Sequence, residues 1–156
     1  MQVLYFDPCR EDTLEFERFF TEMVESKKIP DGANLICGYD KSVLSLVGSR
    51  GGVNIGFLDF FVADEYSDLS EEVARVIHSV YPEALLYGLV PMNNEDERVD
   101  SMRYENILAE ERLYKNTPFL RDCQQFLLEG YARSRNLFPN EPRGVRKLAK
   151  ILRLVR

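Results

Sequence analysis

The chain has 156 residues, 45% of them hydrophobic and 29% charged, which fits one globular domain with a sizeable core. No apolar stretch approaches the length of a membrane span, and the N-terminus lacks the basic-then-apolar pattern of a signal peptide, so a cytoplasmic protein is expected. The cysteines (Cys9, Cys37 and Cys123) are odd in number and widely spaced, and His78 is the only histidine. This pattern favours core cysteines over a disulfide framework or a metal site.

The net charge of −6 is divided unevenly along the chain. Residues 141–156 hold six basic groups against Glu141 alone, a charge of +5, so the other 140 residues carry −11. Helical spacing from residue 143 onward puts apolar side chains on one side and, on the other, Arg143, Arg146, Lys147, Lys150 and Arg153. We predict an amphipathic helix that docks on its own acidic body, binds a protein partner, nucleic acid or anionic membrane, or does both.

The first half of the chain predicts a strand, a helix and three further strands. Gln2–Phe6 reads as the first strand, and Asp12-Thr13-Leu14-Glu15 has the spacing of a capping box that opens a helix. Strand-like runs follow at 34–39, 42–47 and 53–62, the first two separated by a tight-turn candidate, Asp40-Lys41. Because both flanks of the glycine-rich segment 48–52 read as strands, it is interpreted as a hairpin turn and not as a phosphate-binding loop.

The second half alternates helices and strands. Asp68-x-x-Glu71 is a second capping-box spacing before a helix that Pro82 stops, and 84–90 reads as a strand. A polar helix is expected over 95–108, a short strand over 111–115, and a helix after Thr117-Pro118. Residues 136–144 read as a linker.

Asp59 interrupts the apolar run 53–62, which is otherwise typical of a central strand covered on both faces. Burying a carboxylate is costly unless it is paired or functional. Asp59 is therefore a candidate general base near a cleft. The alternative is that it pairs with an arginine or lies near a bulge at Gly56.

Two segments resemble motifs of the GNAT superfamily of N-acetyltransferases. The run Val62-Ala63-Asp64-Glu65-Tyr66-Ser67-Asp68-Leu69-Ser70 resembles the family's Val-x-Pro-Glu-Tyr-Arg-Gly-x-Gly loop. Val90-Pro91-Met92-Asn93-Asn94, followed by Tyr104-Glu105-Asn106-Ile107-Leu108, resembles its V-x-x-x-N … Y-E-K-L-G segment. The resemblance covers about residues 1–115.

The resemblance implies an α/β fold with a mixed, mostly antiparallel central sheet flanked by helices. It implies a GNAT-like domain at 1–116. Beyond that domain, the residue pattern predicts a packed helical extension at 117–136 and the linker with its basic helix at 137–156. In an active member the cofactor would be acetyl-CoA, contacted by Val62, Ala63 and Asn94. Tyr104 would be the general acid, and Glu65 or Asp59 the base.

Departures from the family's pattern point away from catalysis. The positions that would offer backbone amides to the acetyl-CoA pyrophosphate fall on Ser67, Asp68, Ser70 and Glu71, without the family's glycines. Carboxylates there repel an anion, so cofactor binding is predicted to be impaired.

Three hypotheses follow: a degenerate GNAT-like binding or accessory protein, an active N-acyltransferase with a non-standard loop, and a structural, virion-associated phage adaptor. A homo-oligomer is left open. A splayed pair of parallel strands at 60–62 and 86–88 would support the family, and a closed sheet there would exclude it.

Overall fold

The computed structural model describes residues 1–29, 31–91, 97–110, 113–114 and 117–136. A five-stranded sheet runs in the order β2-β1-β3-β6-β7, and each neighbouring pair is parallel. Its strands are β1 (Gln2–Phe6), β2 (Asn34–Gly38), β3 (Ile55–Asp59), β6 (Leu85–Val90) and β7 (Leu113–Tyr114). The helices are α1 (Arg10–Glu25), α2 (Ser42–Ser49), α3 (Asp68–Val80), α4 (Glu97–Tyr104) and α5 (Thr117–Asn136). A short antiparallel hairpin, β4 (Phe61–Val62) and β5 (Glu65–Tyr66), follows β3.

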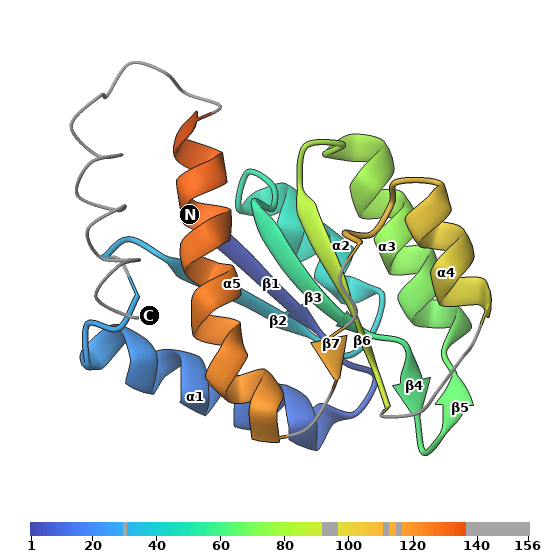
Figure 1. Cartoon of the computed structure of the whole chain (residues 1–156), viewed down its shortest axis with the longest axis horizontal. Helices are drawn as coiled ribbons and strands as arrows, with labels where there is room; N and C mark the ends of the chain where they lie inside the picture. Colours follow the sequence, from blue (N-terminus) through green and yellow to red (C-terminus); the bar gives the residue numbers. More distant parts are fainter. Residues whose placement is uncertain (30, 92–96, 111–112, 115–116, 137–156) are drawn as a thin grey trace.

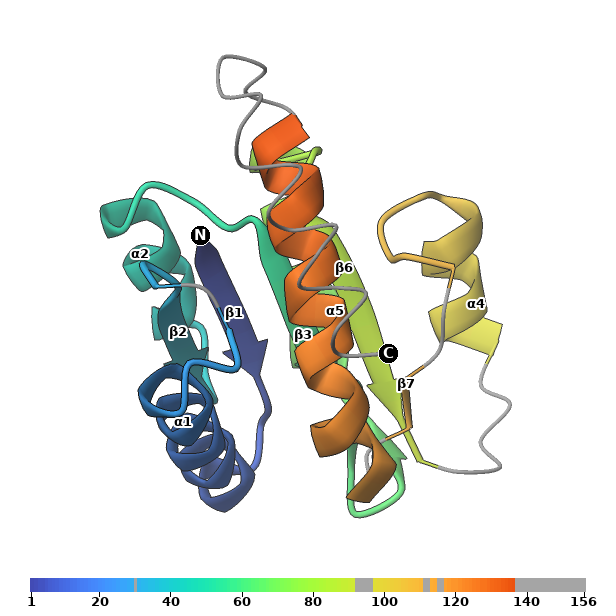
Figure 2. The same ribbon diagram turned by 60° about the vertical axis from the view of Figure 1, so that its left-hand side comes forward.

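The sheet is covered on both faces, which gives two hydrophobic clusters. Helices α1 and α5 lie over one face, and α2, α3 and α4 over the other (Figures 1 and 2). Successive residues of each strand point to opposite faces, so Tyr5 and Phe57 pack under α1 and α5 while Phe6 and Leu58 pack under α2 and α3. All five residues of β3 are buried, which confirms the prediction of a central strand covered on both sides.

The predicted antiparallel, GNAT-like sheet is wrong. Strands β3 and β6 pair in continuous parallel register from Ile55 with Leu85 to Asp59 with Leu89, so no splayed pair of strands exists there. The strand order instead matches the flavodoxin-like doubly wound pattern, in which helices cover both faces of a parallel sheet.

The main error lies at 42–47, which forms helix α2 and not a strand. Val43 and Val47 are buried one helical turn apart, and the Asp40 carboxylate accepts a hydrogen bond from the Ser42 amide at 2.9 Å. Asp40-Lys41 therefore precedes a helix and is not a hairpin turn. The glycine-rich segment joins α2 to β3, and Gly51 and Gly52 have positive φ angles of 85° and 114° as the chain leaves the helix.

Both predicted capping boxes are also wrong. Helix α1 begins at Arg10, before Asp12, and its N-cap Cys9 makes no side-chain capping bond. Helix α3 is capped by Ser67, whose hydroxyl accepts a hydrogen bond from the Ser70 amide at 3.2 Å. The helices themselves, and the strand predicted at 84–90, are present.

Among the described residues, no helix is both long and apolar enough to cross a lipid bilayer. The predicted basic helix, with Arg143, Arg146, Lys147, Lys150 and Arg153, lies outside these residues and stays a prediction. The domain boundaries at 116 and 136 also stay predictions. Helix α5 contributes Cys123 and Leu127 to the cluster under α1.

Candidate functional site

Two aspartates lie side by side where β1 and β3 end. The register pairs Phe6 with Leu58, so the next residues along the two strands are Asp7 and Asp59. Because side chains alternate between the two faces of a sheet, both aspartates lie on the same face as Tyr5 and Phe57. Both are buried, at 0% and 1% exposure. The chain continues from β1 to β2 on one side and from β3 to β6 on the other, so this is the point where the strand order reverses. Doubly wound sheets bind ligands at that point.

The Asp7 side chain is held in place by donors on both of its oxygens. Oδ1 accepts a hydrogen bond from the Cys9 amide at 2.8 Å, and Oδ2 accepts one from the Tyr5 hydroxyl at 3.1 Å. The Thr13 hydroxyl donates to the Asp7 carbonyl at 3.2 Å, which ties α1 to the end of β1. The carboxylate therefore has a fixed orientation before any ligand binds.

Asp59 is connected to the hairpin and to α3. Its Oδ1 accepts a hydrogen bond from the Phe61 amide at 2.9 Å, and its carbonyl accepts one from the Ser70 hydroxyl. The Ser67 amide donates to the Phe60 carbonyl at 2.8 Å. Any change at the Asp59 carboxylate therefore acts directly on the start of β4.

Tyr5 places a neutral phenol among the acidic groups. Its ring stacks on Phe16 with centroids 4.0 Å apart. Burial raises the pKa of Tyr5, and the negative charges of Asp7, Asp59 and Asp12 raise it further. The phenol therefore stays protonated and can donate its hydrogen bond to Asp7 at any physiological pH.

Tyr66 links the hairpin to α3 and α4. Its ring contacts the rings of Phe60 and Phe61, with centroids 6.1 and 5.8 Å away. The Arg98 guanidinium lies over the same ring, 3.6 Å from its centroid. The Tyr66 hydroxyl donates to Glu71 at 2.6 Å.

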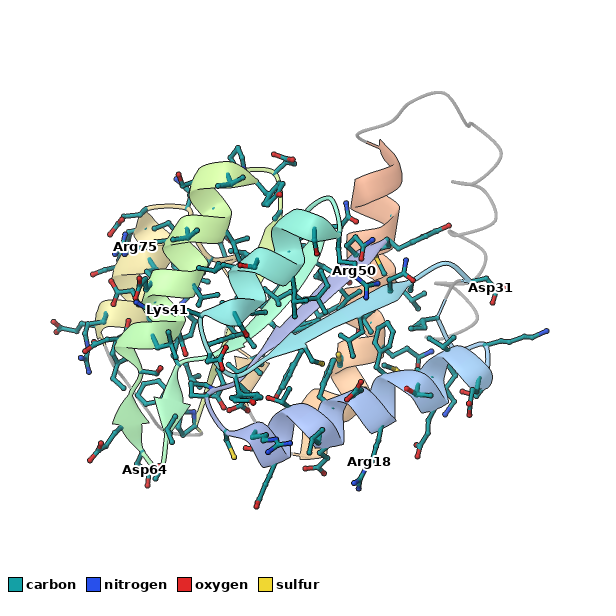
Figure 3. All side chains as sticks on the ribbon, turned by 180° about the vertical axis from the view of Figure 1, so that it is seen from behind. Arg18, Asp31, Lys41, Arg50, Asp64 and Arg75 are labelled. Carbon is teal, nitrogen blue, oxygen red and sulfur yellow. The ribbon has the colours of Figure 1, made fainter. Side chains whose placement is uncertain are left out.

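Arg75 continues this network from α3 to α4. Its guanidinium donates to Glu71 at 2.9 Å and to both oxygens of Glu105 at 2.7 and 3.3 Å. Figure 3 shows Arg75 on α3 and Asp64 at the tip of the hairpin below it. The hairpin, α3 and α4 are therefore joined by one set of polar contacts.

This network gives a pH-dependent stability. Mainly the hydrogen bond from Tyr66, and then Arg75, lowers the pKa of Glu71 from its ordinary value. A lowered pKa stabilises the fold above the unfolded-state pKa of roughly 4.3, and the gain is lost as the pH falls. We expect Tyr66→Phe to cost about 1 kcal/mol at pH 7 and much less at pH 3, measured by urea unfolding.

The matched control is Tyr104→Phe, because that ring is 88% exposed. It should leave the unfolding free energy unchanged at both pH values. If Tyr66→Phe lowered the unfolding free energy equally at pH 7 and pH 3, the hydrogen bond from Tyr66 would not depend on the charge of Glu71.

The cysteines do not gather with other ligands. In the described part of the chain, no group of three His, Cys, Asp or Glu side chains could hold a metal ion. Burial, and then the charge of Glu17, raises the pKa of Cys37 to about 12, and burial raises that of Cys123 as well. These two thiols therefore stay protonated.

The residues predicted for acetyl transfer lie on separate elements. Asp59 ends β3, Glu65 is exposed in β5, and Tyr104 is at the C-terminal end of α4. Val62 and Ala63 belong to a hairpin whose two turn residues, Ala63 and Asp64, have positive φ angles, and not to a cofactor loop before a helix. Asn94 lies outside the described residues. The predicted acid, base and cofactor-binding roles depended on a GNAT fold, which this chain does not have. They therefore stay predictions.

No protein-family model matches the sequence, and no curated protein sequence matches it significantly. Solved structures do match the fold. A response regulator receiver domain from Clostridium thermocellum is similar with a TM-score of 0.63 at 14% identity, covering 87% of this chain and 98% of that one. A signal receiver domain of a putative LuxO repressor from Vibrio parahaemolyticus has a TM-score of 0.62 at 11% identity, covering 90% and 97%.

The fold is that of a receiver domain. NtrX from Brucella abortus, solved in complex with ATP, is also similar, with a TM-score of 0.62 at 16% identity, covering 87% of this chain and 28% of that one. These likenesses replace the GNAT acetyltransferase interpretation, and with it the acyltransferase and phage-adaptor functions. In this chain, Asp7 and Asp59 lie at the switch point between β1 and β3.

The sequence signalled half of this pair. Asp59 is conspicuous because it interrupts an apolar strand, whereas Asp7 follows the first strand and has no comparable local signal. A local sequence pattern does not show that Asp7 and Asp59 are neighbours. Both are acidic residues at the carboxyl ends of buried strands, and only the parallel register brings them together.

Proposed function

We propose that this chain is a receiver-like signalling domain in which Asp59 accepts a phosphoryl group and thereby changes the binding of a partner protein. The observation that carries the proposal is the Asp7–Asp59 pair, adjacent in register at the switch point of the sheet. Aspartate carboxylates are known nucleophiles in enzymatic phosphoryl transfer, where they form aspartyl phosphates.

The donor set fits a divalent cation beside the phosphoryl group. Mg²⁺ is usually bound by one or two carboxylates together with phosphate oxygens and waters. Asp7 and Asp59 supply two carboxylates, and the Tyr5 and Cys9 hydrogen bonds keep that of Asp7 oriented. A bound cation would supply positive charge that offsets the charge of the two acids.

Phosphorylation would act through the hairpin. The modified side chain carries a charge of roughly −1.5 to −2 and three acceptor oxygens. Such a group enlarges a fully buried side chain directly beside the Phe61 amide. The hairpin and the Tyr66 network would therefore rearrange, which offers a partner protein a different surface.

Acetyl phosphate tests the proposal directly. A carboxylate oxygen of Asp59 attacks phosphorus, the bond to the acetyl oxygen breaks, and acetate leaves. We expect the full chain with Mg²⁺ to gain one phosphoryl group, seen by intact-mass spectrometry and removed by hydroxylamine.

Substitutions test whether Asp59 is the residue that accepts the phosphoryl group. Asp59→Asn should abolish labelling, and Asp7→Asn should lower it at least tenfold. Asp64→Asn is the matched control, because it exchanges the same groups at the exposed hairpin tip, where asparagine tolerates the positive φ angle. Labelling that persists in Asp59→Asn would refute the assignment.

A second candidate is a binding domain of the same fold that works without phosphorylation. It is favoured by the burial of both carboxylates and by the hydrogen bonds that Asp7 accepts on both oxygens. A chain that acetyl phosphate and Mg²⁺ do not label would support this candidate.

A further inference from the structure

A pocket of about 450 Å³ lies at the C-terminal end of α4. Its lining includes Asp100, Arg103, Tyr104 and Glu110, and we call it the α4 pocket. The C-terminal end of α4 lies at the opposite end of the sheet from the carboxyl ends of the strands (Figure 1). The α4 pocket is therefore separate from the aspartate pair.

The walls of the α4 pocket combine an aromatic ring, carboxylates and one guanidinium. Tyr104 is 88% exposed, whereas α4 buries Val99 and Met102 against the core. Arg103 donates to Asp100 at 3.2 Å, so its charge is balanced within the helix.

These groups suit a cationic side chain of a peptide segment. An aromatic face attracts lysine and arginine, and nearby carboxylates add an ion pair. The same molecule already uses this contact, since Arg98 lies over Tyr66 and Arg10 lies 5.9 Å from the ring centroid of Tyr39.

The chain itself supplies a segment of this chemistry. Residues 143–156 contain six basic side chains and no acidic one. Helix α5 ends at Asn136, at the same end of the sheet as the C-terminal end of α4 (Figure 2). The six residues 137–142 can span up to roughly 20 Å. If the tether reaches the α4 pocket, the effective concentration of the segment there is on the order of millimolar, which favours the chain's own segment over a second copy.

We propose that the α4 pocket binds a lysine or arginine side chain from the chain's own basic segment 143–156. The basic segment is then held on the body at α4. An acidic partner that binds the segment must compete with the α4 pocket for it.

Zero-length carbodiimide cross-linking of the full chain tests this, because it joins lysine amines to carboxylates in direct contact. We expect amide links from Lys147 or Lys150 to Asp100 or Glu110, identified by peptide mass spectrometry. The yield should fall several-fold between 50 and 500 mM salt. In an equal mixture of ¹⁵N-labelled and unlabelled chains, each link should join peptides of the same isotope.

Variants separate the α4 pocket from general charge attraction. Tyr104→Ala should lower the yield at least threefold, and its exposed ring makes the change harmless to folding. Glu110→Gln should abolish the link at that residue. Glu22→Gln is the matched control on the exposed surface of α1 and should change nothing.

Three results would overturn the proposal. They are the absence of links from Lys147 and Lys150 to either carboxylate, links that Tyr104→Ala leaves unchanged, and links that join labelled to unlabelled peptides. The last result would assign the contact to a second copy.

Discussion

Replacing Phe57 by alanine is expected to destabilise the fold by about 3–5 kcal/mol. Phe57 is fully buried in the central strand β3, where its ring lies 5.7 Å from that of Tyr87 and 6.2 Å from that of Phe16. Those rings connect the sheet to α1 and α5, so no single element can collapse into the cavity. Urea unfolding followed by circular dichroism measures the loss.

Val62→Ala is the control for Phe57→Ala. It also removes an apolar side chain close to Asp59 in sequence, but Val62 is 40% exposed in β4. We expect a change of less than about 0.5 kcal/mol. A loss from Phe57→Ala no larger than that of Val62→Ala would mean that the rings around β3 are not packed as described.

The second large effect is expected at Gly38, the last residue of β2. A Cβ atom added there would lie 2.5 Å from both Cβ and Cγ2 of Val43 in α2. Val43 is β-branched and fully buried, so it cannot rotate away and α2 must move. Gly38→Ala is expected to cost about 1–3 kcal/mol of unfolding free energy.

Gly48→Ala has the opposite expected sign. Gly48 is exposed in α2, and an added Cβ would meet nothing within 4 Å. Alanine there should stabilise the chain by up to about 1 kcal/mol, because it favours the helix. The two variants make the same chemical change, one at a close contact and one in open space. Equal effects would contradict the close approach of α2 to β2.

The fold was predictable wherever an element is long and periodic. Helices α1, α3 and α5 and strands β1 and β6 follow from apolar spacing, because each buries one stripe or both faces. Helix α2 was missed because the run 42–47 within it fits a strand and a helix equally well. Reading it as a strand places three consecutive strands joined by tight turns in the first half of the chain, which favours an antiparallel sheet. One short element thus decided the topology.

The candidate site was predictable only in part. A carboxylate within an apolar strand is visible in the sequence, and Asp59 was identified on that basis. Its pairing with Asp7 depends on the parallel register of strands about 50 residues apart, which no local pattern reports. The Tyr66 network also joins three elements through contacts of long sequence separation.

The position of Tyr5 has a practical consequence for observing the site. The chain has eight tyrosines and no tryptophan, so tyrosine dominates its near-ultraviolet signal. Tyr5 is 3% exposed, and its hydroxyl donates a hydrogen bond to Asp7, which is next to Asp59 in register. A change of charge at either acid alters the electric field at that phenol. Ultraviolet difference spectroscopy, compared between the natural chain and Tyr5→Phe, would therefore report occupancy of the site without any attached label.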